Sequence, residues 1–211
     1  TWKITSDGFY SSGGGDNFAL SDTSAENFIY EADVTFGDTK GAASLVFRSG
    51  DAPGSSSYVA NTIKNEGLAR IFKFPGGSNV GSASIDTSKD SYHLRVEAIG
   101  TSLKFYIDDV LLVAGNDDTY TGGKLGLLTF NSTVTYQNVM YKEITASELP
   151  SLTNLTVTGD GVTFTPTFDA SVASYSAYLP AGVTKMNVTA TAAEGTTLTY
   201  SIVSGGGVEY D

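Results

Sequence analysis

Apolar and polar residues alternate in short runs along most of this chain, which places successive side chains on opposite faces of β-strands. In Phe28–Phe36 every even position is apolar or aromatic, whereas Glu31 and Asp33 occupy odd positions. Gly, Asn and Asp separate the runs, and no helical stripe is convincing. Up to residue 144 the pattern predicts strands at 18–20, 27–36, 42–48, 58–64, 69–74, 92–99, 103–108, 110–114, 124–130 and 135–141. Strands of this number with short connections favour two packed sheets.

The pattern breaks at residues 147–151, where Pro150 and small residues separate two strand-rich parts. We therefore predict a first domain over 1–146, a linker over 147–151 and a second, smaller β domain over 152–211. The second domain is near the lower size limit for an independent core, and we expect its C-terminal end to be cut off after the glycines at 205–207. Its predicted strands are 152–158, 162–168, 174–180, 185–191 and 197–202.

Composition excludes several classes of function. The net charge is −11 and no run of Lys or Arg is present, so the chain should not bind nucleic acid or insert into a membrane. Cysteine is absent and His93 is the single histidine, which excludes disulfides, a cysteine nucleophile and a multi-histidine zinc site. Without a signal peptide or a span of transmembrane length, the chain is expected to be part of a longer, secreted or cell-surface bacterial protein.

One pair of charges is the best candidate for chemistry. Glu31 and Arg48 each lie on the face of their strand opposite to the apolar positions. If the two strands are neighbours in one sheet, the carboxylate and the planar guanidinium meet and can hold the vicinal hydroxyls of a sugar. From the residues alone, an exposed ion pair without function explains the two charges equally well.

Catalysis and metal binding have weaker support. Glu31-Ala32-Asp33 matches the start of the catalytic strand in some jelly-roll glycoside hydrolases, but Thr35 and Phe36 stand where a further acid is needed. We therefore predict that the chain is not an enzyme. The Asp-rich segments 108–109 and 116–118 could hold a structural calcium ion, although such segments are more often simple turns, and no cofactor is required.

A series of short motifs follows a recognisable order along residues 1–144: 16–21, 30–34, 46–49, 58–61, 72–74, 92–94, 105–109, 126–127 and 136–139. Their order resembles the fructan-binding carbohydrate-binding modules of bacterial levanases, module family 66. The resemblance implies a concanavalin-like jelly-roll β-sandwich that binds terminal fructose units of levan or related fructans without catalysis. Where the levanase module has a Trp-Asp pair, this chain has Phe130-Asn131, so one carboxylate is replaced by an amide.

The resemblance also suggests a set of ligand-binding residues. The charged groups of Glu31 and Arg48 would hold the hydroxyls, and the amides of Asn131 and Gln137 would add hydrogen bonds. The rings of Tyr58 and Phe130 would form an apolar wall, and Asp16, Asn61 and Lys73 would lie further out. From the residues alone, either aromatic ring could equally belong to the core.

Residues 152–204 resemble the cadherin-like β-sandwich repeats of bacterial surface proteins and secreted enzymes, with motifs at 155–157, 166–168, 175, 180, 183 and 188–190. This implies an immunoglobulin/cadherin-like spacer without a site of its own. The whole chain is expected to be a monomeric polysaccharide-binding part of a secreted glycoside hydrolase. The alternative is a cell-surface adhesin segment that recognises a different glycan or a host protein.

Overall fold

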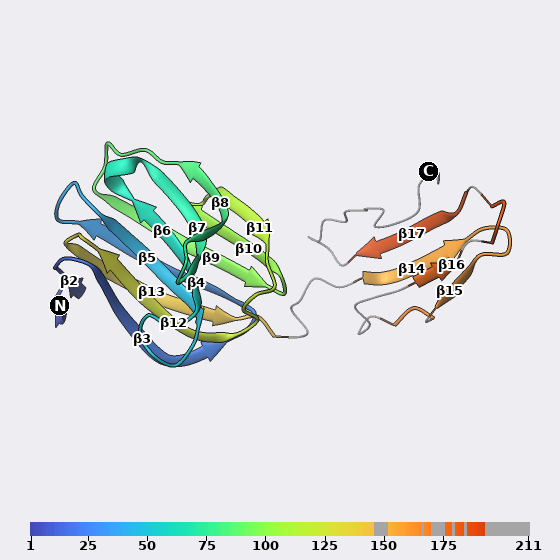
Figure 1. Ribbon diagram of the computed structural model, residues 1–211, viewed down its shortest axis with the longest axis horizontal. Coiled ribbons are helices and arrows are strands. Elements are labelled where there is room, and N and C mark those ends of the chain that lie inside the picture. Colours follow the sequence, from blue (N-terminus) through green and yellow to red (C-terminus); the bar gives the residue numbers. More distant parts are fainter. Residues whose placement is uncertain (146–151, 166, 170–175, 179, 184, 193–211) are drawn as a thin grey trace. The chain divides into compact units, whose positions relative to one another are not determined.

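The computed structural model describes residues 1–145, 152–165, 167–169, 176–178, 180–183 and 185–192. The chain divides into two compact units, Thr1–Ala146 and Ser147–Asp211 (Figure 1). The predicted linker at 147–151 lies outside the described residues. No helix in the described ranges is long and apolar enough to cross a membrane.

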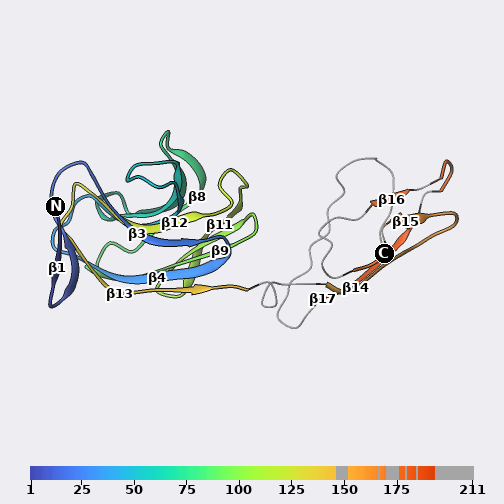
Figure 2. The same cartoon turned by 90° about the horizontal axis from the view of Figure 1, so that it is seen from below.

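The first unit is a sandwich of two antiparallel sheets, which Figure 2 shows as two layers. The seven-stranded sheet has the order β1 (Trp2–Thr5), β2 (Gly8–Ser11), β13 (Val134–Glu143), β4 (Phe28–Phe36), β9 (Ser91–Ile99), β10 (Ser102–Ile107) and β11 (Val110–Asn116). The six-stranded sheet has the order β3 (Asp16–Ala25), β12 (Gly123–Phe130), β5 (Ala42–Ser49), β6 (Ser57–Ile63), β7 (Leu68–Phe74) and β8 (Ser78–Ser84). The predicted all-β sandwich is thereby confirmed for this unit.

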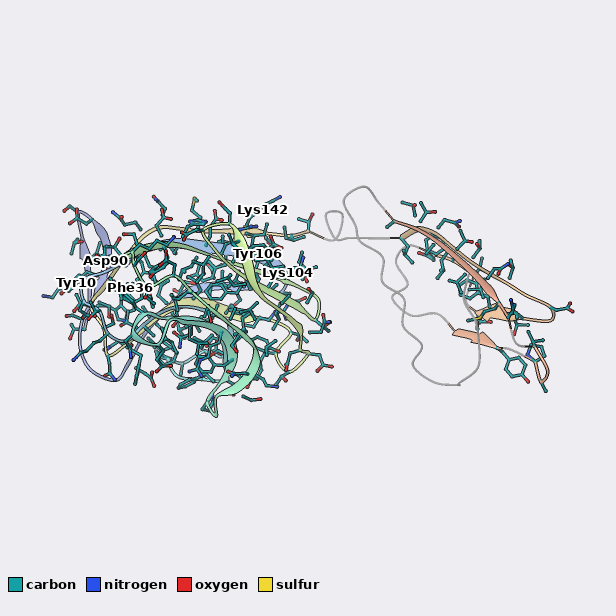
Figure 3. All side chains as sticks on the ribbon, turned by 90° about the horizontal axis from the view of Figure 1, so that it is seen from above. Tyr10, Phe36, Asp90, Lys104, Tyr106 and Lys142 are labelled. Atoms are coloured by element: carbon teal, nitrogen blue, oxygen red, sulfur yellow. The ribbon has the colours of Figure 1, made fainter. Side chains whose placement is uncertain are left out.

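The core lies between the two sheets and follows the alternation of the strands. On β4 the residues Phe28, Ala32 and Val34 are almost completely buried, and on β5 Leu45 and Phe47 meet them from the other sheet. The rings of Phe28 and Phe47 are 6.0 Å apart in an edge-to-face arrangement. Figure 3 shows how densely side chains fill this layer. Burial of these alternating apolar faces is the main driving force for the sandwich.

Tyrosine hydroxyls fix the two sheets against each other inside this core. Tyr136 of β13 accepts a hydrogen bond from the Ser44 N–H at 2.8 Å and donates one to the Leu128 carbonyl at 2.8 Å. Tyr30 of β4 donates to the Gly126 carbonyl at 3.0 Å. Burial raises the pKa of both tyrosines, so both hydroxyls keep their protons. Because the hydrogen-bond partners of the two hydroxyls are backbone groups of β5 and β12, these bonds set the position of one sheet on the other.

Three strands escaped prediction, and all of them are short or polar. β1 and β2 form a hairpin at one edge of the seven-stranded sheet, and β8 is the edge of the six-stranded sheet. β8 has the sequence SNVGSAS, in which Val80 and Ala83 are separated by two residues, so no apolar alternation marks it as a strand. The predicted hairpin of β10 and β11 is confirmed. Asp108 and Asp109 at its bend have φ of 50° and 64°, which suits a two-residue turn.

In the second unit the described strands form two antiparallel pairs. β14 (Leu152–Thr158) pairs with β17 (Asn187–Ala192), and β15 (Thr163–Thr165) pairs with β16 (Ser176–Tyr178). These strands overlap the predicted strands at 152–158, 162–168, 174–180 and 185–191. The predicted strand at 197–202 lies outside the described residues.

Replacing Tyr136 by Phe should destabilise the first unit by about 1–3 kcal/mol, because the Ser44 N–H and the Leu128 carbonyl lose a buried partner. Chemical denaturation measures this change. Tyr141→Phe on the same strand is the matched control and should alter stability by less than about 0.5 kcal/mol, because Tyr141 is 48% exposed. Equal effects of the two variants would contradict the role of the Tyr136 hydroxyl.

Candidate functional site

A cavity of about 730 Å³ opens on the outer face of the six-stranded sheet. One part of its lining is polar: Asp16, Ser44, Asn61, Arg70 and Asn131. Another part is apolar: Phe72, Phe74, Leu128 and Phe130. Several of these apolar residues belong to a small hydrophobic cluster on this face, separate from the main core. The site therefore combines hydrogen-bonding groups with an apolar wall, as small-molecule sites commonly do.

Strand β7 brings an arginine into this cavity. Its residues Ala69 and Ile71 are buried in the core, so the alternation turns Arg70 and Phe72 outward. The guanidinium carbon of Arg70 lies 4.3 Å from the centre of the Phe72 ring, in a cation–π contact. Its Nε is buried without a hydrogen-bond partner, and within the described residues Arg70 has no ion-pair partner within 4.0 Å. The Nη groups of Arg70 also make no hydrogen bond within the described residues, and they are the donors available to a ligand at the cavity.

Asn61 stands beside this arginine on the neighbouring strand. The two residues are direct partners in the register of β6 and β7. The Ser44 hydroxyl donates to the Asn61 Oδ1 at 3.1 Å, and Asn61 is only 6% exposed. This bond orients the amide with its oxygen toward Ser44, and its nitrogen donors have no partner in the described part of the chain.

Phe130 and Asn131 form the rim of the cavity together with Asp16. Phe130 is 43% exposed and is the register partner of Asp16 across β12 and β3. Asn131 has a φ of 47°, in the left-handed region that Asn tolerates better than most residues. The Gly15 N–H donates to the Asn131 Oδ1 at 2.7 Å, and the Asn131 N–H donates to the Gly15 carbonyl at 3.4 Å. Asn131 thus holds the glycine-rich loop that precedes Asp16.

Comparison with known proteins shows which family has this architecture. A carbohydrate-binding module of Bacillus subtilis, titled CBM66, superposes with a TM-score of 0.63 and 35% sequence identity, covering 68% of this chain and 91% of that structure. The chain belongs to carbohydrate-binding module family 66. A B. subtilis protein with a galectin-like fold shares the architecture of this family 66 module at 12% identity and a TM-score of 0.58. No family model matches the chain.

Curated relatives of the family 66 module are much longer proteins. A levanase of B. subtilis is 37% identical over 144 residues, which is 66% of this chain and 21% of the levanase. A fructan β-fructosidase of Streptococcus mutans is 29% identical over 178 residues, which is 76% of this chain and 12% of that protein. A levanase of Bacillus sp. strain L7 is 33% identical over 141 residues. The chain thus spans about a fifth or less of each of these relatives.

The prediction that Glu31 and Arg48 lie side by side and together hold a sugar is wrong. β4 belongs to the seven-stranded sheet and β5 to the six-stranded sheet, so the two side chains do not share a face. Arg48 is 2% exposed and donates to the backbone carbonyls of Glu26 at 2.6 Å, Gly100 at 2.9 Å and Tyr120 at 3.1 Å. Burial lowers its pKa, yet the three carbonyls satisfy the guanidinium. Arg48 therefore ties three loops together inside the module.

Two further predicted residues lie on the outer face of the seven-stranded sheet. Glu31 is opposite Arg95 in the register of β4 and β9. Gln137 on β13 is exposed and is opposite Asp33. Neither residue lines the cavity on the six-stranded sheet.

Tyr58 and Lys73 do not line the cavity either. Both side chains contact Asp117 instead. Tyr58 is completely buried in the core, and its hydroxyl donates to the Asp117 Oδ1 at 2.5 Å. The Lys73 ammonium is 2.8 Å from the Asp117 Oδ2. Burial alone would raise the pKa of Asp117, but hydrogen bonds from Lys73, Thr119 and Tyr58 outweigh it and hold this pKa well below its usual range.

The same contacts involve the Asp-rich segments 108–109 and 116–118, which the sequence suggested as possible calcium ligands. The Asp117 carboxylate, which lies in the Asp-rich segment 116–118, is already engaged by Lys73 and Tyr58. The Asp108 carboxylate contacts Lys89 and the His93 N–H. In the ranges that the structure covers, no group of three or more Asp, Glu, His or Cys side chains is arranged to hold a metal ion.

Four of the nine predicted residues therefore meet at the cavity: Asp16, Asn61, Phe130 and Asn131. Sequence reasoning missed Arg70, Phe72 and Ser44. A signal for Arg70 was present, because in Leu68–Phe74 it alternates with Ala69 and Ile71 and shares its face with Phe72 and Phe74. Ser44 carried no signal, since its place depends on Asn61 and Tyr136, which are far from it in sequence.

Replacing Arg48 by Ala should lower stability by roughly 3 kcal/mol, because three carbonyls lose their donors. For a domain of this size that corresponds to a fall of about 10 °C in the melting temperature, measured by calorimetry. Arg70→Ala is the matched control and should change the melting temperature little, because Arg70 bonds to no carbonyl in the described structure. An unchanged melting temperature in Arg48→Ala would contradict the structural role.

Replacing Asn131 by Gly should make the Gly15 amide exchange with solvent about tenfold faster, because the acceptor at 2.7 Å is lost while the left-handed backbone is retained. Asn131→Asp should retain the protection, since a carboxylate oxygen can accept the same bond. Hydrogen exchange measured by NMR gives both rates. Equal protection of Gly15 in all three proteins would show that Asn131 does not hold the loop.

Proposed function

We propose that this family 66 module binds fructans without catalysis, with a terminal fructose unit in the cavity on the six-stranded sheet. The names of its relatives, two levanases and a fructan β-fructosidase, favour this ligand class. The observation that carries the proposal is Arg70, whose guanidinium lines the cavity without an ion-pair partner among the described residues. The Nη groups of this arginine make no hydrogen bond in the described structure and can donate to a ligand.

The chemistry of the cavity suits a neutral sugar. A planar guanidinium presents parallel donors that match two vicinal hydroxyl oxygens, and the Asn61 amide nitrogen adds further donors. Asp16 on the rim supplies a carboxylate that accepts hydrogen bonds from hydroxyls. Phe130 supplies an exposed ring against which the C–H groups of a sugar can pack. Donors, an acceptor and an apolar wall therefore surround one space.

The replacement of Trp-Asp by Phe130-Asn131 affects this binding in a defined way. The Asn131 oxygen is already used by the Gly15 N–H, so the residue acts on the sugar mainly by holding the loop that carries Asp16. Phe130 offers a smaller ring than tryptophan, and thus less contact area. We infer a weaker apolar contact than in a module with the Trp-Asp pair.

The larger context of the module is also part of the proposal. We infer that it is a monomeric accessory module of an extracellular bacterial glycoside hydrolase, which it keeps close to its polysaccharide. Shallow sugar sites bind weakly, and covalent linkage to an enzyme raises the effective concentration of substrate. The partial match to much longer levanases supports this arrangement.

We propose in addition that the second unit is an immunoglobulin/cadherin-like β-sandwich that serves as a spacer. The support is its strand content: β14 pairs with β17 and β15 with β16, each in the antiparallel sense. The exposed residues alternate with half-buried ones along β14 and β17, as expected for strands that bury one face.

Replacing Arg70 by Ala should reduce fructan affinity at least tenfold, because the bidentate donors are lost, while the melting temperature stays nearly constant. Titration calorimetry of the whole chain against levan, inulin and an unrelated β-glucan measures the affinity. Arg70→Lys should restore only part of it, since an ammonium group lacks the planar fork. Lys104→Ala, on the other sheet, is the control and should bind like the parent.

Two results would count against the proposal. Failure of the parent protein to bind any fructan would remove the assigned ligand class and favour an adhesin for another glycan. Fructan binding that survives in Arg70→Ala with undiminished affinity would place the sugar outside this cavity.

A further inference from the structure

A second depression, of about 330 Å³, lies on the outer face of the seven-stranded sheet. Its lining comes from three adjacent strands: Ile29 and Glu31 of β4, Arg95 of β9, and Met140, Tyr141 and Lys142 of β13. Figure 3 labels Lys142 of β13 as well as Lys104 and Tyr106 of β10, the strand beside β9. This depression belongs to the opposite sheet from the proposed fructose cavity and shares no residue with it.

The neighbours of Arg95 hold its guanidinium in place. Its central carbon lies 4.0 Å from the centre of the Tyr106 ring, and its Nη1 is 2.5 Å from the Glu97 Oε1. The Tyr106 hydroxyl in turn donates to the other Glu97 oxygen at 2.9 Å. The Arg95 Nε is nevertheless buried without a hydrogen-bond partner. The Arg95 Nη2 is 3.9 Å from the Asp109 Oδ1 and makes no hydrogen bond in the described structure, so the preorganised side chain keeps its donors on Nη2.

Glu31 faces Arg95 across the strands without pairing with it. The two residues are direct register partners on β4 and β9, yet their charged atoms do not come within 4.0 Å of each other. The His93 ring lies closer to this carboxylate, with its Nε2 3.6 Å from the Glu31 Oε2. A carboxylate and a guanidinium that stand opposite each other but apart leave room for hydroxyl groups between them.

The charges of the depression select the kind of ligand. The lining holds one carboxylate, Glu31, and two cations, Arg95 and Lys142. A cationic ligand would meet two like charges and an anionic ligand would meet Glu31, whereas a neutral polyhydroxyl compound can donate to Glu31 and accept from Arg95 and Lys142. Met140 and Tyr141 are about half exposed and supply an apolar surface for C–H groups. We propose that this depression is a second, independent binding site for a neutral sugar unit.

Two sites on opposite sheets would make the module bivalent. The outer faces of the two sheets point away from each other because their inner faces form the common core. A single module would then hold two glycan chains, or two parts of one branched chain, at the same time. The second site would raise the avidity for polysaccharide over that for a single sugar.

The test is an NMR titration of the isotope-labelled whole chain with fructose and a short fructo-oligosaccharide, in the parent and in Arg70→Ala. The choice of fructose as the probe rests on the proposed function. In both proteins we expect shifts of the backbone amides of Ile29, Glu31, Arg95 and Met140. The apparent affinity read from these shifts should fall at least fivefold in Glu31→Gln. It should stay unchanged in the control Glu143→Gln, which lies at an exposed position of β13.

The outcomes separate the two proposals. Shifts confined to the six-stranded sheet at saturation, or shifts on β4 and β9 that Glu31→Gln does not affect, would overturn the second site. Shifts at Ile29, Glu31 and Arg95 without any at Asn61 and Arg70 would support the second site and overturn the proposed fructose cavity.

Discussion

The hydroxyl of Tyr136 is the contact on which the rest of the module depends. It crosses the core from the seven-stranded sheet and satisfies backbone groups of Ser44 and Leu128 in the other sheet. Ser44 then bonds through its own hydroxyl to Asn61, which lines the cavity beside Arg70. Buried polar groups with a single correct partner specify one arrangement of the sheets. The geometry of the binding face is thus coupled to the register of the core.

The three arginines show how partners, more than residue type, decide what a side chain does. Arg48 is surrounded by backbone carbonyls and acts as a structural tie. Arg95 pairs with Glu97 and lies on Tyr106, which orient it but leave its Nη2 without a hydrogen bond in the described structure. Among the described residues, the Arg70 side chain contacts the ring of Phe72 and has no hydrogen-bond or ion-pair partner. Hydrogen bonds thus compensate the desolvation of the Arg48 guanidinium, compensate that of Arg95 in part, and do not compensate that of Arg70 within the described structure.

Both faces of the sandwich are polar, but they are built differently. On the six-stranded sheet the donors line a cavity together with the exposed ring of Phe130 and the buried ring of Phe72. On the seven-stranded sheet Asp33, His93, Glu31 and Arg95 follow one another across β4 and β9. Asn138 and His93 donate hydrogen bonds to Asp33 and hold its pKa below the ordinary value, so the Asp33 carboxylate keeps its charge to lower pH than an ordinary aspartate.

The sequence by itself determined the strands with strong alternation, the residues that face the core, the hairpin at Asp108-Asp109 and the resemblance to family 66. It also identified Asp16, Asn61, Phe130 and Asn131, since the order of motifs pointed to them. Only the tertiary structure decided which strands are neighbours, and this separated Glu31 from Arg48 and brought Arg70 to Asn61. The physical reason is that the alternation of apolar and polar residues assigns each side chain to one face of its strand but does not say which strand lies beside it. Strands with the same alternation can pair equally well in many orders, and only long-range contacts select one of them.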